Sequence, residues 1–256
     1  MIPNGELAAT VRRGLARART TAVLALMIGA GSAQAGDRAL AEFLGYSSDG
    51  RYFAFEEYGI QDGSGFAYST IYVIDLPADA WVAGTPYRVQ AGDSDADALL
   101  SDIRGEAGEQ AAAKLETLGI ETPAEVLVLL GDGVPGADGK SMAFSLPVWW
   151  PPGSTGEAVF SLELTTFDAE SAEPCQDYIG EKARGFALSF ASGGDLVGLY
   201  RDGKLPKSRG CPLDYRLYAV VRPFAGGAGP AVVIISSYPF GFEGPNRRFL
   251  VLPLGD

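Results

Sequence analysis

The chain contains no histidine among its 256 residues. This absence excludes mechanisms that need an imidazole, such as the Ser-His-Asp and Cys-His nucleophile pairs, and the usual zinc and haem ligand sets. Carboxylate chemistry stays open, because Asp and Glu together number 32. From residue types alone we expect no metal site and assign no catalytic residue.

Basic residues are scarce. Lys and Arg together number 20, which leaves a net charge of −12. Four arginines and one glutamate fall within residues 1–35, so removal of that segment would take the net charge to −15. A surface of this sign repels nucleic acid phosphates and anionic lipid. Nucleic acid is therefore not an expected partner.

Long apolar runs are also missing, apart from residues 21–30 near the N-terminus. That run is about half the ~20 residues of a spanning helix. Four arginines precede it, and the small-x-small triplet Ala33-Gln34-Ala35 follows it; the arginines are Arg12, Arg13, Arg17 and Arg19. This pattern predicts a Sec-type signal peptide over 1–35 with cleavage after Ala35. We expect one periplasmic or secreted domain over 36–256, with no membrane span.

Only two cysteines are present, Cys175 and Cys211. In an oxidising compartment two cysteines most simply form one structural disulfide. No Cys-x-x-Cys spacing indicates a redox pair. The loop entropy removed by such a bridge corresponds to roughly 4 kcal/mol of stabilisation.

Most of the chain after Ala39 has the pattern of short strands. Apolar, β-branched and aromatic runs alternate with Gly, Pro and Asp, and Ser48-Asp49-Gly50 predicts a hairpin turn. Strands are expected at 52–55, 71–76, 81–89, 125–130, 141–150, 157–167, 185–190, 195–200, 215–221, 231–237 and 247–252. The pattern favours a mainly β, antiparallel two-sheet sandwich-like fold with long hairpin loops. An irregular β-propeller is the alternative, since residues 48–55 resemble part of a propeller blade.

One helical insertion is expected over about 94–119. Apolar residues recur there every three or four positions, and Gly119 is a stop signal. Gly105 and Gly108 predict a break or two short helices. Asp93, Asp95 and Asp97 are interpreted as capping residues. They also resemble the start of a calcium loop, but Ala98 and Arg104 replace its glycine and glutamate, so cation binding stays undecided.

Two cofactor motifs are incomplete. Gly131-x-Gly133-x-x-Gly136 follows a strand, and turn residues come next. A dinucleotide site would require a helix at that place. Gly139-Lys140-Ser141 lacks the earlier glycine of a phosphate-binding loop. We therefore expect no cofactor. Trp149-Trp150 is interpreted as core, with one ring available for ligand stacking as the alternative.

The strongest candidate site is a basic segment in this acidic chain. Four cations fall within nine residues, and Cys211 would pin the segment at one end: Arg201, Lys204, Lys207 and Arg209. Such a loop suits an anionic group through charge-assisted hydrogen bonds. The alternative is a solvated turn that offsets nearby acidic residues.

Two function classes follow. Long hairpin loops on a rigid β scaffold favour a soluble binding or interaction protein of the cell envelope, whose partner is an anionic ligand or an envelope protein. The alternative is a carboxylate-based, glycosidase-like hydrolase, which needs two carboxyls facing each other across a cleft. The sequence singles out no such pair.

Several stretches together carry a resemblance: Ser48 to Gly59, Ile71 to Asp75, Leu205 to Pro212 and Arg247 to Val251. With the N-terminal signal, they resemble a bacterial family of predicted secreted proteins with a domain of unknown function. The resemblance covers nearly the whole of 36–256. It implies export and a single domain, and it implies no activity, cofactor or catalytic residue.

Overall fold

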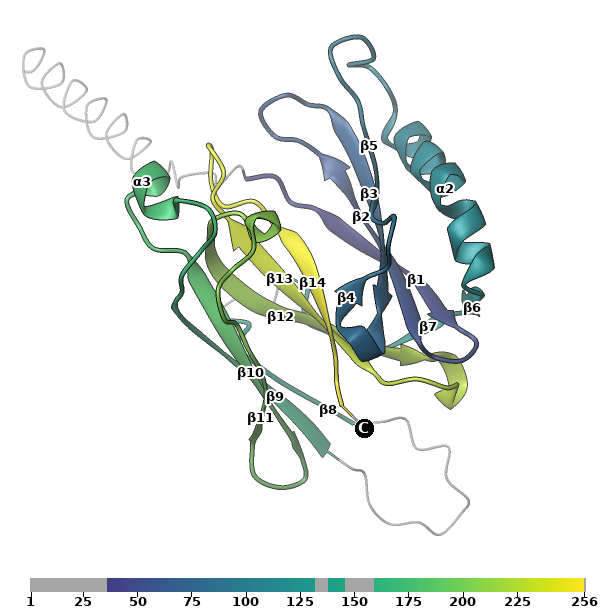
Figure 1. Ribbon diagram of the computed structural model, residues 1–256, viewed down its shortest axis with the longest axis vertical. Helices are drawn as coiled ribbons and strands as arrows, with labels where there is room; N and C mark the ends of the chain where they lie inside the picture. The colour runs from purple at the N-terminus through teal and green to yellow at the C-terminus, as the bar shows by residue number, and fades with distance from the viewer. Residues whose placement is uncertain (1–35, 132–137, 146–158, 256) are drawn as a thin grey trace, which may run out of the picture. The chain divides into compact units, whose positions relative to one another are not determined.

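The computed structural model describes residues 36–131, 138–145 and 159–255, which build three antiparallel sheets (Figure 1). The N-terminal sheet has the order β4 (Ala80–Trp81), β3 (Ala67–Asp75), β2 (Tyr52–Ile60), β1 (Leu40–Ser47) and β6 (Ile120–Thr122), and β5 (Tyr87–Gln90) also pairs with β3. The central sheet has the order β14 (Arg248–Pro253), β13 (Val232–Pro239), β12 (Pro212–Pro223) and β7 (Ala124–Leu129). The outer sheet has the order β11 (Val197–Arg201), β10 (Arg184–Ser192), β9 (Val159–Asp168) and β8 (Ser141–Ser145).

The mainly β, antiparallel fold is confirmed, but the strands form three sheets rather than the two expected. The reason lies in the central sheet, which is buried on both faces. Val232 and Ile234 pack in the core shared with the N-terminal sheet, while Val233 and Ile235 pack in the core shared with the outer sheet. Successive residues of a strand point to opposite faces, so a continuous apolar run fits a strand between two cores. The described strands form no propeller.

The predicted hairpin at Ser48-Asp49-Gly50 joins β1 to β2. Gly50 has φ 71°, and a Cβ there would stand 2.2 Å from the Ala228 carbonyl oxygen. Only glycine allows both the left-handed conformation and this close approach. The turn therefore also contacts the loop that follows β12.

The helical insertion is confirmed as α2 (Leu100–Thr117), followed by Gly119 at φ 63°. The predicted break at Gly105 and Gly108 is wrong, because the helix is continuous. Its buried stripe of Ile103, Ala107 and Ala111 packs against the N-terminal sheet, and this packing outweighs the cost of two glycines, about 1 kcal/mol each.

Other expectations need smaller corrections. The aspartates do not cap α2: Leu99 is its N-cap, and the Asp95 carboxylate accepts a hydrogen bond from the Gly92 N–H at 2.7 Å. The single strand expected over 81–89 is two strands, because a turn closed by the Thr85 N–H to the Val82 carbonyl separates β4 from β5, with a cis peptide bond before Pro86.

The remaining elements are short: α3 (Cys175–Ile179) and the 3-10 turns η1 (Leu76–Ala78), η2 (Lys207–Arg209) and η3 (Phe224–Gly226). Among the described residues, neither α-helix combines the length and the apolar composition needed to cross a membrane.

Candidate functional site

The basic segment is anchored at its Cys211 end and near its middle. The predicted disulfide between Cys175 and Cys211 is confirmed, with a Cα–Cα distance of 5.4 Å. Leu205, in the middle of the segment, is buried beside Cys175 and Ala183, and it forms a short parallel bridge with Ser171. The path between β11 and β12 is therefore fixed by a covalent bond and by a small apolar cluster.

The structure does not bring the four predicted cations to one point. Arg201 is exposed, with its guanidinium 3.8 Å from the centre of the Phe167 ring. Lys204 and Lys207 are exposed and form no ion pair with the described residues. Arg209, at the end of η2, turns inward, and its side chain is 13% exposed. Of the four, Arg209 lines a large cavity.

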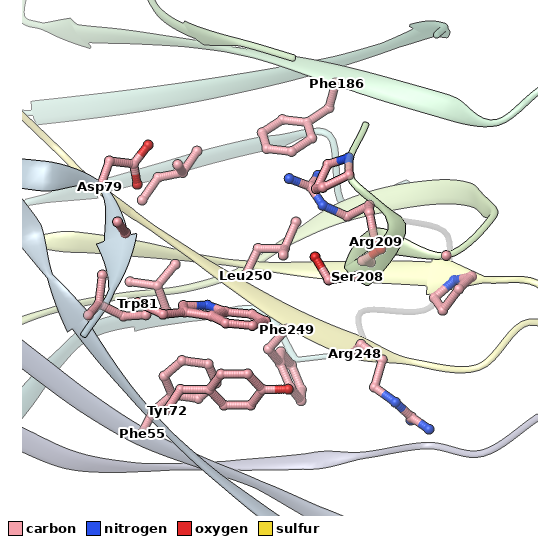
Figure 2. A pocket seen from close by; sticks show the side chains of 18 of the residues that line it. Phe55, Tyr72, Asp79, Trp81, Phe186, Ser208, Arg209, Arg248, Phe249 and Leu250 are labelled. Atoms are coloured by element: carbon pink, nitrogen blue, oxygen red, sulfur yellow. The ribbon is translucent and has the colours of Figure 1, made fainter. Parts of the chain in front are cut away.

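That cavity is a cleft of about 530 Å³ to which all three sheets contribute (Figure 2). It runs beside β14, the edge strand of the central sheet, between β3 to β5 on one side and β10, β11 and η2 on the other. Its aromatic lining consists of Phe55, Tyr72, Trp81, Phe186, Tyr200 and Phe249, and its cations are Arg88, Arg209 and Arg248. An apolar cleft with a few charged groups is the usual form of a small-molecule site.

Arg209 is held by Asp202, whose side chain is 3% exposed. This carboxylate accepts hydrogen bonds from the Phe186 N–H at 2.9 Å and the Tyr200 hydroxyl at 2.8 Å, and it lies 3.5 Å from Arg209. Arg209 also donates to the Tyr215 hydroxyl at 3.3 Å. Burial raises the pKa of Tyr200 and of Tyr215 to about 12, so both hydroxyls stay neutral.

Among the described residues, the Nη1 of Arg209 donates to Asp202 at 3.5 Å and to Tyr215 at 3.3 Å, and both contacts are long. Arg209 also interacts with the Tyr200 hydroxyl closely enough to oppose the rise in its pKa. A guanidinium has five N–H donors in a planar fork. The Arg209 side chain is thus held in position at the wall of the cleft, with long contacts that use one of its three nitrogens.

Arg248, by contrast, is used within the protein. Its Nη2 lies 2.5 Å from Asp37, and its Nη1 donates to the Arg247 carbonyl at 2.7 Å and to the Tyr68 hydroxyl at 3.2 Å. Its Nε lies 3.5 Å from Glu57. Arg248 therefore contributes positive potential to the cleft, but few free donors.

Glu57, on β2, is the remaining partner in the network around Arg248. Its carboxylate accepts the Phe249 N–H at 2.9 Å and is buried. Burial raises its pKa to about 7, although Arg248 and the Phe249 N–H favour the charged form. Glu57 therefore ties the N-terminal sheet to the edge strand of the central sheet with a group that titrates near neutrality.

The wall of the cleft that β2, β3 and β4 form, opposite Arg209, is aromatic. Tyr72 stacks on Phe55 with ring centres 4.9 Å apart, and Trp81 lies 5.5 Å from Tyr72. Trp81 is 45% exposed, and the Arg88 guanidinium lies 5.8 Å from its ring centre. An exposed indole beside a cation offers a stacking surface to a flat or apolar ligand.

Asp79 is the one described acidic residue that lines the cleft. It follows η1 at φ 46°, a left-handed conformation that aspartate tolerates better than most residues. The residue is exposed, yet the surrounding walls remove enough water to raise the pKa of its carboxylate, an effect that Arg209 opposes. A glycosidase needs two carboxyls across the bond, and the described lining holds one.

A family model with the description "Predicted secreted protein (DUF2259)" matches residues 54–254. The chain belongs to the DUF2259 family. Every residue that lines the cleft, from Phe55 to Leu252, lies within the matched part. A search of curated proteins and a search of solved structures found no match to this DUF2259 protein.

The other predicted features lie away from the cleft. Asp93, Asp95 and Asp97 are exposed in the loop before α2, and no group of three metal-ligating side chains occurs among the described residues. The Trp149-Trp150 pair and most of the Gly131–Gly136 motif lie outside the described residues of this DUF2259 protein.

Asp79, Trp81, Arg88 and Arg248 were not predicted as site residues. One signal was present for Arg248, because two adjacent arginines open an otherwise apolar final strand.

Proposed function

We propose that this DUF2259 protein is an exported binding protein of the cell envelope, and that its cleft takes an anionic ligand with an apolar body. Export is by a Sec-type signal peptide cleaved after Ala35, and the mature protein is periplasmic or secreted. The observation that carries the binding function is Arg209, a mostly buried cation that lines an aromatic cleft and is held there by long contacts from one of its nitrogens.

Desolvation makes this arginine effective. The side chain is mostly buried, and the aromatic residues around it lower the local dielectric, so a charge-assisted hydrogen bond is stronger there than in water. Asp202 neutralises part of the charge from behind but lies 3.5 Å away. A ligand carboxylate or phosphate at the Nε and Nη2 edge would receive two parallel hydrogen bonds.

Arg201, Lys204 and Lys207 have a different role in this proposal. They are exposed on the segment that carries Arg209, and they add positive potential to a protein of strongly negative net charge. Such a local field raises the rate at which anions reach the cleft more than it raises their final affinity. We therefore keep these residues in the binding surface and give the direct contact to Arg209.

The test uses 3-phenylpropionate, which has one carboxylate and one apolar ring, and isothermal titration calorimetry on the mature protein. Wild-type protein is expected to bind it, and Arg209→Gln to weaken binding by about ten- to a hundredfold, the value of one charge-assisted hydrogen bond. Arg184→Gln is the matched control, because Arg184 pairs with Asp168 on the outer sheet and lines no part of the cleft.

Replacing both Lys204 and Lys207 with Ser is expected to slow association and to reduce its salt dependence, with a smaller change in affinity. Equal affinity of wild-type and Arg209→Gln proteins, both shown to be folded, would refute the proposed function.

A further inference from the structure

Asp79 and Arg209 lie on different walls of the cleft and do not pair with each other, and Arg88 lies on the Asp79 side beside Trp81. Figure 2 shows Asp79 on one side and Arg209 on the other, with Phe186 and Leu250 near the space between them. No ion pair joins them, and the Asp79 carboxylate forms no ion pair or hydrogen bond with the described residues. Their fields do interact, since Arg209 lowers the pKa of Asp79. The cleft thus has a free anion and a partly free cation facing each other.

The strand between these walls adds peptide hydrogen-bonding groups. β14 pairs with β13 on one side only. The Leu254 N–H donates to Ala231 across the ladder, whereas the Phe249 N–H turns away from β13 and donates to Glu57. Backbone direction alternates along an antiparallel strand, so the N–H and C=O of Val251 also point away from β13. Val251 lines the cleft.

We infer that the anionic ligand of the proposed function is a short peptide whose N- and C-termini are chemically unmodified. Its carboxylate pairs with Arg209, its ammonium pairs with Asp79, and its backbone lies beside the β14 edge. This inference rests on the proposed function and narrows it to one chemical class. Main-chain pairing with an exposed strand edge is a common mode of peptide recognition.

Charge complementarity favours this occupant over a simple anion. An anion without a positive group would leave Asp79 unpaired in a partly dehydrated wall and would be repelled by it. A cation without a carboxylate would leave Arg209 with Asp202, 3.5 Å away, as its acidic partner and would be repelled by the arginine. A peptide with unmodified termini pairs with both groups, and its apolar side chain contacts Tyr72 and Trp81. The unsatisfied groups therefore select for a zwitterion.

The test compares three probes by calorimetry on the mature protein: the dipeptide Ala-Phe, its N-acetyl form and its C-terminal amide. We expect each blocked form to bind about tenfold or more weakly than the free dipeptide, because each loses one charge-assisted pair. Asp79→Asn should abolish the preference for the free over the acetylated form. Arg209→Gln should abolish the preference for the free over the amidated form.

This crossed pattern distinguishes ligand contacts from a general loss of structure, which would weaken all three probes together. Asp97→Asn is the control, since Asp97 is exposed and lies away from the cleft. If 3-phenylpropionate binds through Arg209 while free and acetylated Ala-Phe bind equally, the proposed function stands and the peptide inference is refuted. If neither the dipeptide nor 3-phenylpropionate binds the folded protein, both are refuted.

Discussion

Replacing Glu57 with Gln is expected to flatten the pH dependence of stability between about pH 4.5 and pH 7. An ordinary glutamate has a pKa of 4.5, and burial raises that of Glu57 to about 7. Between these values the native protein keeps a proton that the unfolded chain has released. Rising pH therefore favours the unfolded chain. The stabilisation that Glu57 contributes below pH 4.5 is lost by about pH 7.

The size of the effect follows from the two pKa values. At 1.36 kcal/mol for each pH unit, the difference corresponds to about 3 kcal/mol at most. Arg248 and the Phe249 N–H already stabilise the charged form, and their effect is included in the pKa of about 7. Gln keeps a carbonyl acceptor for the Phe249 N–H and does not titrate, so the variant removes the pH dependence and retains that hydrogen bond.

The assay is urea unfolding of the mature protein at pH 5, 6, 7 and 8, with Glu57→Gln and with Glu121→Gln as an exposed control. The absence of histidine helps, because no imidazole titrates in this range. Wild-type protein and Glu121→Gln should lose stability as the pH rises, and Glu57→Gln should lose about 2.5 kcal/mol less between pH 5 and pH 8, because part of the full difference is already lost at pH 5. Wild-type and Glu57→Gln curves that fall in parallel, within about 0.5 kcal/mol, would refute the assigned pKa.

Three further predictions concern processing and stability. N-terminal sequencing of the protein isolated from the cell envelope should begin at Gly36, and an uncleaved protein in that fraction would contradict the predicted signal peptide. Replacing Cys175 and Cys211 with Ser should lower the free energy of unfolding by about 4 kcal/mol, because the bridge closes a loop with a sequence separation of 36; an unchanged urea midpoint would contradict this. Gly50→Ala should destabilise the protein by about 1–3 kcal/mol, since its Cβ would stand 2.2 Å from the Ala228 oxygen, whereas Gly63→Ala, with no atom within 4 Å, should have little effect; equal melting temperatures for the two variants would count against this packing.

Local patterns predicted much of the fold. Glycine, proline and aspartate marked the ends of most strands, and the pair of cysteines predicted the disulfide. The number of sheets could not be predicted from the sequence. The run Val232 to Ile235 indicates burial on both faces of a strand, but it does not indicate which elements cover each face. Continuity of α2 through Gly105 and Gly108 was missed for a similar reason, since the stabilising contacts come from β3 and β5, which lie outside the helical segment.

The candidate site was only partly predictable. A cluster of four cations is visible in sequence, but the turn η2 directs Arg209 inward and leaves Lys204 and Lys207 in water. That difference depends on Asp202 and Tyr215, which are placed by strand pairing. Asp79 follows η1 and Trp81 ends β4 in the N-terminal sheet, and no local pattern relates them to Arg209.

The most direct test of the central claim is a crystal structure of the mature protein with 3-(4-bromophenyl)propionate, located by the anomalous signal of bromine. The account predicts the carboxylate within hydrogen-bond distance of Arg209 and the ring between Trp81 and the β14 edge. A bromine signal confined to sites outside this cleft, at a ligand concentration where calorimetry shows binding, would contradict it.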